Sequence, residues 1–258
     1  MRVSQFFAAV AVCGVSVSVA HADTAYFNLA TGSLLQDWST ATLITTNDNW
    51  SGVPSITGYL GDIDSGSISD VDPRTLTTGA LGVVDVIANQ TTASITNGGV
   101  AEFAITNPVV ALQGSGAADA PALVFYLNAT NRQAVNVSFN IRDVDGTSDN
   151  AAQQVNVQYR LTPGGVFTNV TGGYFADVTT TGTATQVTPV SLTLPANANN
   201  APQVEVRVLT TNAAGSDEWV GIDDINISSA AVIPEANTLG LLALALPVIG
   251  GVIARRRK

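Results

Sequence analysis

The stretch RDVDGTSDN, at residues 142–150, combines residue types that bind hard cations with the glycine of a tight turn. Calcium takes its oxygen ligands from loops of this kind. The flanking segments alternate as strands, and Val155 stands near the place of the closing glutamate, so an EF-hand is excluded. The sequence leaves two interpretations open, a hairpin turn and a calcium site. The candidate calcium ligands are the side-chain oxygens of Asp143, Asp145, Asp149 and Asn150.

The segment GSDEWVGIDDINIS, at residues 215–228, is a second acidic stretch. If it forms a strand, successive side chains point to opposite faces, so Asp223 or Asp224 points inward or lies at a sheet rim. A carboxylate in such a place needs a partner, which a metal ion or an arginine supplies. We therefore add Asp223 to the candidate metal ligands. The alternative is a structural contact with backbone amides or with an arginine such as Arg142.

Two aromatic residues, Trp50 and Tyr59, stand among turn residues in the segment NDNWSGVPSITGYLGDIDSG, at residues 47–66. Aromatic side chains on loops offer large, flat contact surfaces, and many sandwich domains use them to bind sugars. Trp50 and Tyr59 are therefore the candidate ligand-binding aromatics. The alternative is that both rings close the open end of a sandwich.

Four residue types are missing from the middle of the chain, and their absence excludes several classes of enzyme. The only examples of these types are Met1, Cys13, His21 and Lys258. Zinc sites draw on His and Cys, serine and cysteine hydrolases need a His base, and Schiff-base or P-loop chemistry needs Lys. None of these sites can be built between the two ends.

The same middle region holds all 20 acidic residues of the chain and only five arginines. Such a surface repels phosphate backbones, so nucleic acid is excluded as a partner and divalent cations are favoured. Paired carboxylates remain the one available catalytic device, as in a glycoside hydrolase or lyase. Glu205 alternates with core valines, so we expect it to face solvent. The other glutamates available for this role are Glu102 and Glu218.

Hydrophobic residues in the middle region recur with a period of two. Residues 135–142, 155–161 and 204–208 alternate apolar and polar side chains, which predicts half-buried strands. Gly, Pro, Asn and Thr punctuate the region at short intervals, and no helical segment separates the strands. We therefore expect an all-β fold, an antiparallel two-sheet sandwich of the jelly-roll type.

Both ends of the chain have the patterns of targeting segments. Arg2, an apolar run and the small-residue site Ala20-His21-Ala22 predict a secretory signal helix. The apolar run from Leu239 to Ala254 would reach only about 24 Å as a helix, so it predicts a short transmembrane helix whose basic end stays in the cytoplasm. The predicted domains are a signal peptide at 1–22, a β-sandwich at 23–232 and an anchor segment at 233–258.

The C-terminal segment resembles the PEP-CTERM sorting signal of Gram-negative bacteria. The resemblance lies in a Pro-Glu core, a short apolar run and a terminal basic cluster, and Ala236 departs from the usual second proline. It implies processing by an exosortase, a transient anchor in the inner membrane, and final localisation at the cell surface or in an extracellular matrix rich in exopolysaccharide. The residues that carry it are Pro234, Glu235, Arg255, Arg256 and Arg257.

The body of the chain resembles the β-sandwich module at the front of some bacterial extracellular nuclease-like proteins. The resemblance covers most of residues 45–228, including the segments NDNWSGVPSITGYLG and IRDVDGTSDNAAQQVNVQYR. In those proteins catalysis belongs to a separate downstream domain, so the resemblance implies a module without active-site residues. We therefore expect an exported, non-enzymatic protein that binds polysaccharide or self-associates, with calcium as its candidate cofactor.

Overall fold

The computed structural model describes residues 20–40, 42–63, 68–95, 97–146 and 151–233. The expected signal helix and C-terminal transmembrane helix lie outside these residues. So do the candidate ligands Asp149 and Asn150 and the sorting residues Pro234, Glu235, Arg255, Arg256 and Arg257. In the part of the chain that is described, no helix is both long and apolar enough to cross a membrane.

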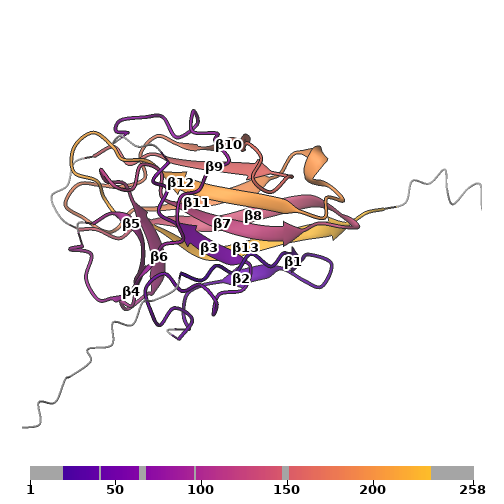
Figure 1. Cartoon of the computed structure of the whole chain (residues 1–258), viewed down its shortest axis with the longest axis horizontal. Coiled ribbons are helices and arrows are strands. Elements are labelled where there is room, and N and C mark those ends of the chain that lie inside the picture. The colour runs from indigo at the N-terminus through magenta and orange to yellow at the C-terminus, as the bar shows by residue number, and fades with distance from the viewer. Residues whose placement is uncertain (1–19, 41, 64–67, 96, 147–150, 234–258) are drawn as a thin grey trace, which may run out of the picture.

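The described residues form two β-sheets and one short 3-10 helix, η1 (Ala196–Ala198) (Figure 1). The six-stranded sheet contains β1 (Phe27–Asn28), β3 (Ile56–Tyr59), β7 (Ala122–Asn128), β9 (Val155–Arg160), β10 (Thr168–Phe175) and β12 (Val204–Thr210). The seven-stranded sheet contains β2 (Leu34–Gln36), β4 (Ile87–Gln90), β5 (Gly99–Phe103), β6 (Val109–Gln113), β8 (Arg132–Asp143), β11 (Val187–Thr193) and β13 (Val220–Ala231). The expected all-β two-sheet sandwich is confirmed.

The strand order makes the sandwich a jelly roll. Strands β6 to β13 are arranged as β11-β8-β13-β6 in one sheet and β7-β12-β9-β10 in the other. The chain therefore crosses repeatedly between the sheets, as two nested Greek keys require. Most neighbouring strands are antiparallel, as expected. The pairs β1–β7 and β4–β5 are parallel, which the sequence pattern did not indicate.

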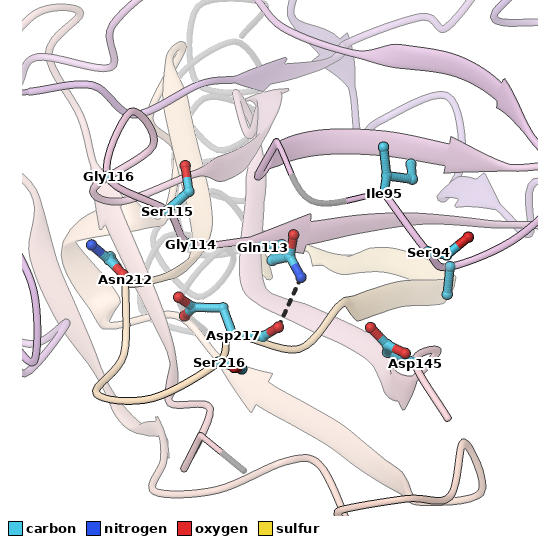
Figure 2. A pocket seen from close by; sticks show the side chains of 11 residues that line it. Ser94, Ile95, Gln113, Gly114, Ser115, Gly116, Asp145, Asn212, Ser216 and Asp217 are labelled. Carbon is cyan, nitrogen blue, oxygen red and sulfur yellow. Dashed lines mark hydrogen bonds between the residues drawn. The ribbon is translucent and has the colours of Figure 1, made fainter. Parts of the chain in front are cut away.

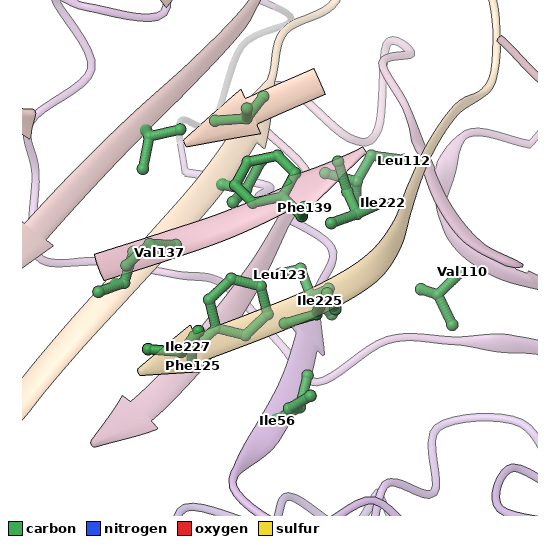
Figure 3. Close-up of a cluster of buried hydrophobic side chains, with 14 of the residues drawn as sticks. Ile56, Val110, Leu112, Leu123, Phe125, Val137, Phe139, Ile222, Ile225 and Ile227 are labelled. Carbon is green, nitrogen blue, oxygen red and sulfur yellow. The ribbon is translucent and has the colours of Figure 1, made fainter. Parts of the chain in front are cut away.

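The hydrophobic core lies between the two sheets, and the alternating pattern of the strands builds it. In β8 every second side chain points inward, while the residues between them are only partly buried. Figure 3 shows side chains from both sheets meeting in this layer. Burying each large side chain contributes roughly 1.5–3 kcal/mol to folding. The inward residues of β8 and β7 include Val135, Val137, Phe139, Ile141, Leu123 and Phe125.

A bulge in β13 changes which side chains reach the core. The pairing of β13 with β8 shifts register between Asp223 and Asn226, and Asp224 adopts a left-handed φ of 52°. The extra residue lets Ile222 and Ile225 both point inward. Asp223 and Asp224 therefore do not simply alternate: Asp223 is buried and Asp224 is exposed.

The outer face of the six-stranded sheet is covered, so β9 and β12 are buried on both faces rather than half-buried. Arg207 on β12 donates to the carbonyl oxygen of Leu76 (2.6 Å), and Arg160 on β9 donates to that of Gly79 (2.9 Å). Both guanidinium groups also lie over the ring of Phe167, at 3.9 and 4.3 Å from its centroid. The segment around residues 76–79 is thereby held against the sheet.

Candidate functional site

A cleft of about 460 Å³ opens at one end of the sandwich. The registers of the seven-stranded sheet explain its position, because Gln113 pairs with Gly99, and Val220 pairs with both Leu112 and Asp143. The ends of β6 and β8 therefore meet the beginnings of β5 and β13. The cleft is lined by Ala93, Ser94, Ile95, Gln113, Gly114, Ser115, Gly116, Asp145, Asn212, Ser216 and Asp217 (Figure 2).

Hydrogen bonds to the backbone fix the polar side chains of this end cleft. Gln113 Nε2 donates to the carbonyl oxygen of Asp217 (2.8 Å), as Figure 2 shows. Asn212 Nδ2 donates to the carbonyl oxygen of Ile68 (3.0 Å). Among the described residues, neither amide oxygen receives a hydrogen bond. Both amides are thus held in place and keep an acceptor for a ligand.

Two further contacts shape the wall of the end cleft. The Asp217 carboxylate accepts the backbone N–H of Ala213 (2.8 Å), which closes the loop before β13. Gly114 lets the end of β6 approach the backbone of Asn212, since a Cβ at this glycine would lie 2.4 Å from the Asn212 Cα. A larger residue at position 114 would therefore displace the Asn212 segment from the cleft.

The predicted calcium loop begins beside this cleft. Asp143 ends β8 and is 3% exposed, and its Oδ2 accepts the backbone N–H of Thr180 (2.9 Å). Its Oδ1 is buried and has no hydrogen-bond partner among the described residues. Burial, and to a smaller degree the carboxylates of Asp145 and Asp177, raises the pKa of Asp143 to about 6, although backbone N–H groups favour its ionised form. Asp145 is buried and reaches the cleft wall.

Within the described ranges, no group of three or more His, Cys, Asp or Glu side chains has the arrangement of a metal site. Asp223, expected as a ligand, is bound instead by Arg142, whose Nη1 lies 2.6 Å from its Oδ2. Asn107 Nδ2 donates to the same oxygen (3.4 Å). The arginine alternative is therefore the arrangement observed, and Asp223 does not line the end cleft. Burial raises the pKa of Asp223 in spite of its arginine partner.

The structure separates the two candidate aromatic residues. Trp50 has no exposed surface: its Nε1 donates to the carbonyl oxygen of Asp85 (3.0 Å), and its ring packs edge-on against Trp38. Its expected role as a ligand-binding aromatic is wrong, because it closes the core instead. Tyr59 on β3 is 8% exposed and lines a second groove on the outer face of the six-stranded sheet, not the end cleft.

The glutamates also differ from expectation. Glu205 does not face solvent, because the covered outer face of β12 buries it beside Arg160, whose Nη2 lies 2.6 Å from its Oε2. Glu102 is buried and accepts the backbone N–H of Asn89 (2.6 Å). Glu218 is buried as well, and none of the three lines the end cleft.

Two of the acidic segments singled out in the sequence contribute to the end cleft, through Asp145 from one and Ser216 with Asp217 from the other. Gln113, Ser115 and Asn212 were missed. Gln113 ends β6, Ser115 lies between two glycines, and Asn212 lies shortly after the end of β12, and polar residues at strand ends are a pattern that any turn can produce. The register of β5, β6 and β13 places Gln113 at the cleft, and the close approach of Gly114 to the segment after β12 of the other sheet brings Asn212 beside it.

No family model and no curated protein matches the chain. Among solved structures, it is similar to the K1 adhesin domain of Lys-gingipain from Porphyromonas gingivalis W83, with 12% identity over 78% of this chain and 99% of that one, and a TM-score of 0.40. It is also similar to a carbohydrate-binding module specific for non-crystalline cellulose, with 11% identity over 51% of this chain and 80% of that one, and a TM-score of 0.34. At these identities and scores the similarities assign no function.

Proposed function

We propose that this chain is a non-catalytic binding domain of an exported protein, and that its end cleft binds a neutral polysaccharide. The observation that carries the proposal is the lining of the cleft, where hydroxyl and amide groups converge on one opening. Sugar hydroxyls both donate and accept hydrogen bonds, and such side chains match both roles. The volume of about 460 Å³ lies within the usual range of ligand sites.

Charge restricts the class of polysaccharide. Asp145 and Asp217 line the cleft, and the chain carries a net charge of −10. An acidic polysaccharide would be repelled by these two carboxylates and by the net negative charge of the chain. Neutral sugar hydroxyls, in contrast, donate to carboxylates in charge-assisted hydrogen bonds. The proposed ligand is therefore uncharged.

Affinity electrophoresis of the full-length chain tests this function. We expect at least one of β-glucan, galactan, xylan or mannan to retard the protein, while alginate does not. Asn212→Ala and Ser216→Ala each remove one cleft contact and should weaken retention on the order of tenfold, as expected for about 1.4 kcal/mol. Asn140→Ala is the matched control, because Asn140 hydrogen-bonds Asp224 on the sheet surface, outside the cleft.

Two results would overturn the proposal. The first is that none of the neutral polysaccharides retards the chain while thermal melting shows it folded. The second concerns the alternative function, since a cleft with two carboxylates also has the minimum equipment of a glycoside hydrolase. Release of reducing sugar from the same polysaccharides, abolished by Asp145→Asn or Asp217→Asn, would make the chain an enzyme.

Calcium is the proposed cofactor of the loop beside the cleft. The support is Asp143, a buried carboxylate with one oxygen left without a hydrogen bond in the described part of the chain. A cation there would neutralise this carboxylate together with its neighbour Asp145, and calcium accepts oxygen ligands in flexible geometries. Asp223 takes no part, because Arg142 already neutralises it.

Export and sorting complete the proposal. The support is the sequence alone: the signal-peptide pattern at 1–22 and the Pro-Glu core, apolar run and basic cluster of 233–258. An exosortase would cut near Pro234 and Glu235 and release the domain from the inner membrane to the cell surface. The test is the mass of the protein in strains with and without the exosortase. An uncut tail in the competent strain would contradict it.

A further inference from the structure

A second groove, of about 330 Å³, lies on the outer face of the six-stranded sheet. Its floor crosses three adjacent strands, because Glu205 on β12 pairs with Tyr126 on β7 and with Arg160 on β9. Tyr59 on the neighbouring β3 also lines the floor. Tyr26 lines the groove as well, and its ring packs edge-on against that of Tyr126. The remaining lining residues are Thr24, Leu81, Pro163 and Gln203.

The charged pair in the floor of this groove is satisfied within the protein. Glu205 Oε1 accepts the hydroxyl of Tyr26 (2.6 Å), and Oε2 accepts Nε of Arg160 (2.7 Å). Arg160 Nη1 donates to the carbonyl oxygens of Gly79 and Gly165. Glu205 and Arg160 therefore form a rigid floor without net charge. Tyr26, which is only partly buried, is held in place by the hydrogen bond from its hydroxyl to Glu205.

The tyrosine pair in the same floor keeps one donor for a ligand. The hydroxyls of Tyr59 and Tyr126 lie 2.6 Å apart and share one hydrogen bond. Two hydroxyls carry two protons, so the second proton has no acceptor in the described part of the chain. Burial raises the pKa of both tyrosines, so both stay protonated and the donor persists across the physiological range.

We propose that this tyrosine groove is a second sugar-binding site, which takes one unit of a neutral polysaccharide. The ring of Tyr26 with Leu81 and Pro163 offers apolar surface to the C–H face of a sugar ring, and the tyrosine pair donates to one of its oxygens. The inference rests on the proposed function, because it assumes the same class of ligand as the end cleft. Two sites on one domain would hold a polymer more tightly than a short oligosaccharide.

The test counts sites by isothermal titration of the full-length chain with hexasaccharides of glucose, galactose, mannose and xylose. We expect two sites for the sugar that binds. Tyr26→Ala should abolish one site or weaken it on the order of tenfold, and Tyr126→Phe should weaken the same site while keeping the ring. Asn212→Ala should affect only the other site. Tyr174→Ala is the matched control, because Tyr174 is partly exposed on β10 and lines neither opening.

The outcomes separate the two proposals. A single site that Asn212→Ala weakens and Tyr26→Ala leaves unchanged overturns the tyrosine groove and keeps the function. Absence of binding to every sugar overturns both. A proline-rich peptide that binds in place of sugar, and is lost in Tyr26→Ala, overturns the assignment of the ligand. Thermal melting of each variant shows whether a loss reflects unfolding, and Tyr126→Phe keeps the test valid if Tyr26→Ala is unstable.

Discussion

Glu205 and Asp143 are both buried carboxylates of one sandwich, and among the described residues only Glu205 has a cationic side chain beside it. Glu205 is the second residue of β12, and strand register sets Arg160 of β9 directly across from it. Asp143 is the last residue of β8, and its Oδ2 accepts the backbone N–H of Thr180. A buried carboxylate can thus be neutralised by the residue across from it on the neighbouring strand, whereas Asp143 lies across from Val220 and accepts a backbone N–H instead.

Asp223 shows that the distinction follows position in a sheet and not residue type. It sits at the bulge of β13, beside β8, and Arg142 of β8 reaches it at 2.6 Å. Arg142 and Asp143 are consecutive in β8, and Arg142 pairs with Asp223, while Asp143 has no arginine partner in the described part of the chain. We therefore infer that the ion pairs between neighbouring strands are structural, and we propose that Asp143 at the end of β8 binds a cation.

The largest expected effect comes from breaking the buried pair inside the sheet. Arg160→Met leaves Glu205 as a buried carboxylate without a cation, which typically costs 3–5 kcal/mol. Denaturant unfolding should show this loss in the free energy of unfolding. It should also disturb the cover of the sheet, because Arg160 holds Gly79 and stacks over Phe167.

Arg74→Met provides the matched control for that experiment. Arg74 pairs with Asp72 at 2.5 Å, but the side chain of Arg74 is exposed (48%) and that of Asp72 is partly exposed (33%). Surface pairs of this kind contribute little to stability, because solvent screens them. If the two variants lose similar stability, burial does not distinguish them, and the contrast between sheet and surface charges is wrong.

The second prediction concerns the strand-end carboxylate. Millimolar calcium should raise the melting temperature of the full-length chain by roughly 5 °C, because a ligand at about a hundred times its Kd stabilises by about 2.7 kcal/mol. Asp143→Asn should abolish this rise. Magnesium is the control ion, since it demands a tighter octahedral shell that a loop of this kind does not offer.

Without calcium, Asp143→Asn should raise the stability of the chain at pH 7 rather than lower it, and this gives a second test. The pKa of Asp143 is raised to about 6, so its contribution to stability is present below the pKa of the unfolded state, near 4, and is lost as the pH rises through about 6. Asp143→Asn removes that loss and should be more stable than the parent at pH 7. A variant that is less stable at pH 7 and still responds to calcium would contradict both statements.

The sequence predicted the sandwich well because its signal is local. Alternation along β8, β9 and β12 reports directly which side chains point inward. It did not report the cover over the outer face, which depends on arginines binding a segment far away in the chain. For that reason Glu205 was expected in solvent and was found in a buried ion pair.

The sites were predicted less well because they depend on register. Asp145 and Asp217 stood out as acidic residues, but Gln113 and Asn212 come from different sheets and meet at one cleft only through the packing of the sandwich. Tyr59 was noticed as an aromatic residue on a loop, yet its partners Tyr126 and Tyr26 come from distant segments. No local pattern marks such a meeting.

The smallest expected effect comes from Asp85, which like Asp143 has no cationic side chain beside it among the described residues. Its Oδ2 accepts the backbone N–H of Val100 (2.6 Å), and burial, with a smaller effect from Asp48, raises its pKa to about 6. Because the folded pKa exceeds the unfolded one, the stabilising contribution is complete below pH 4 and disappears as the pH passes 6. Asp85→Asn mimics the protonated form, so its free energy of unfolding in urea should fall less steeply than that of the parent as the pH rises from about 4 to about 7, by about 1 kcal/mol or less. An unchanged slope would show that the N–H of Val100 alone is enough to hold a buried carboxylate, and would weaken the same argument for Asp143.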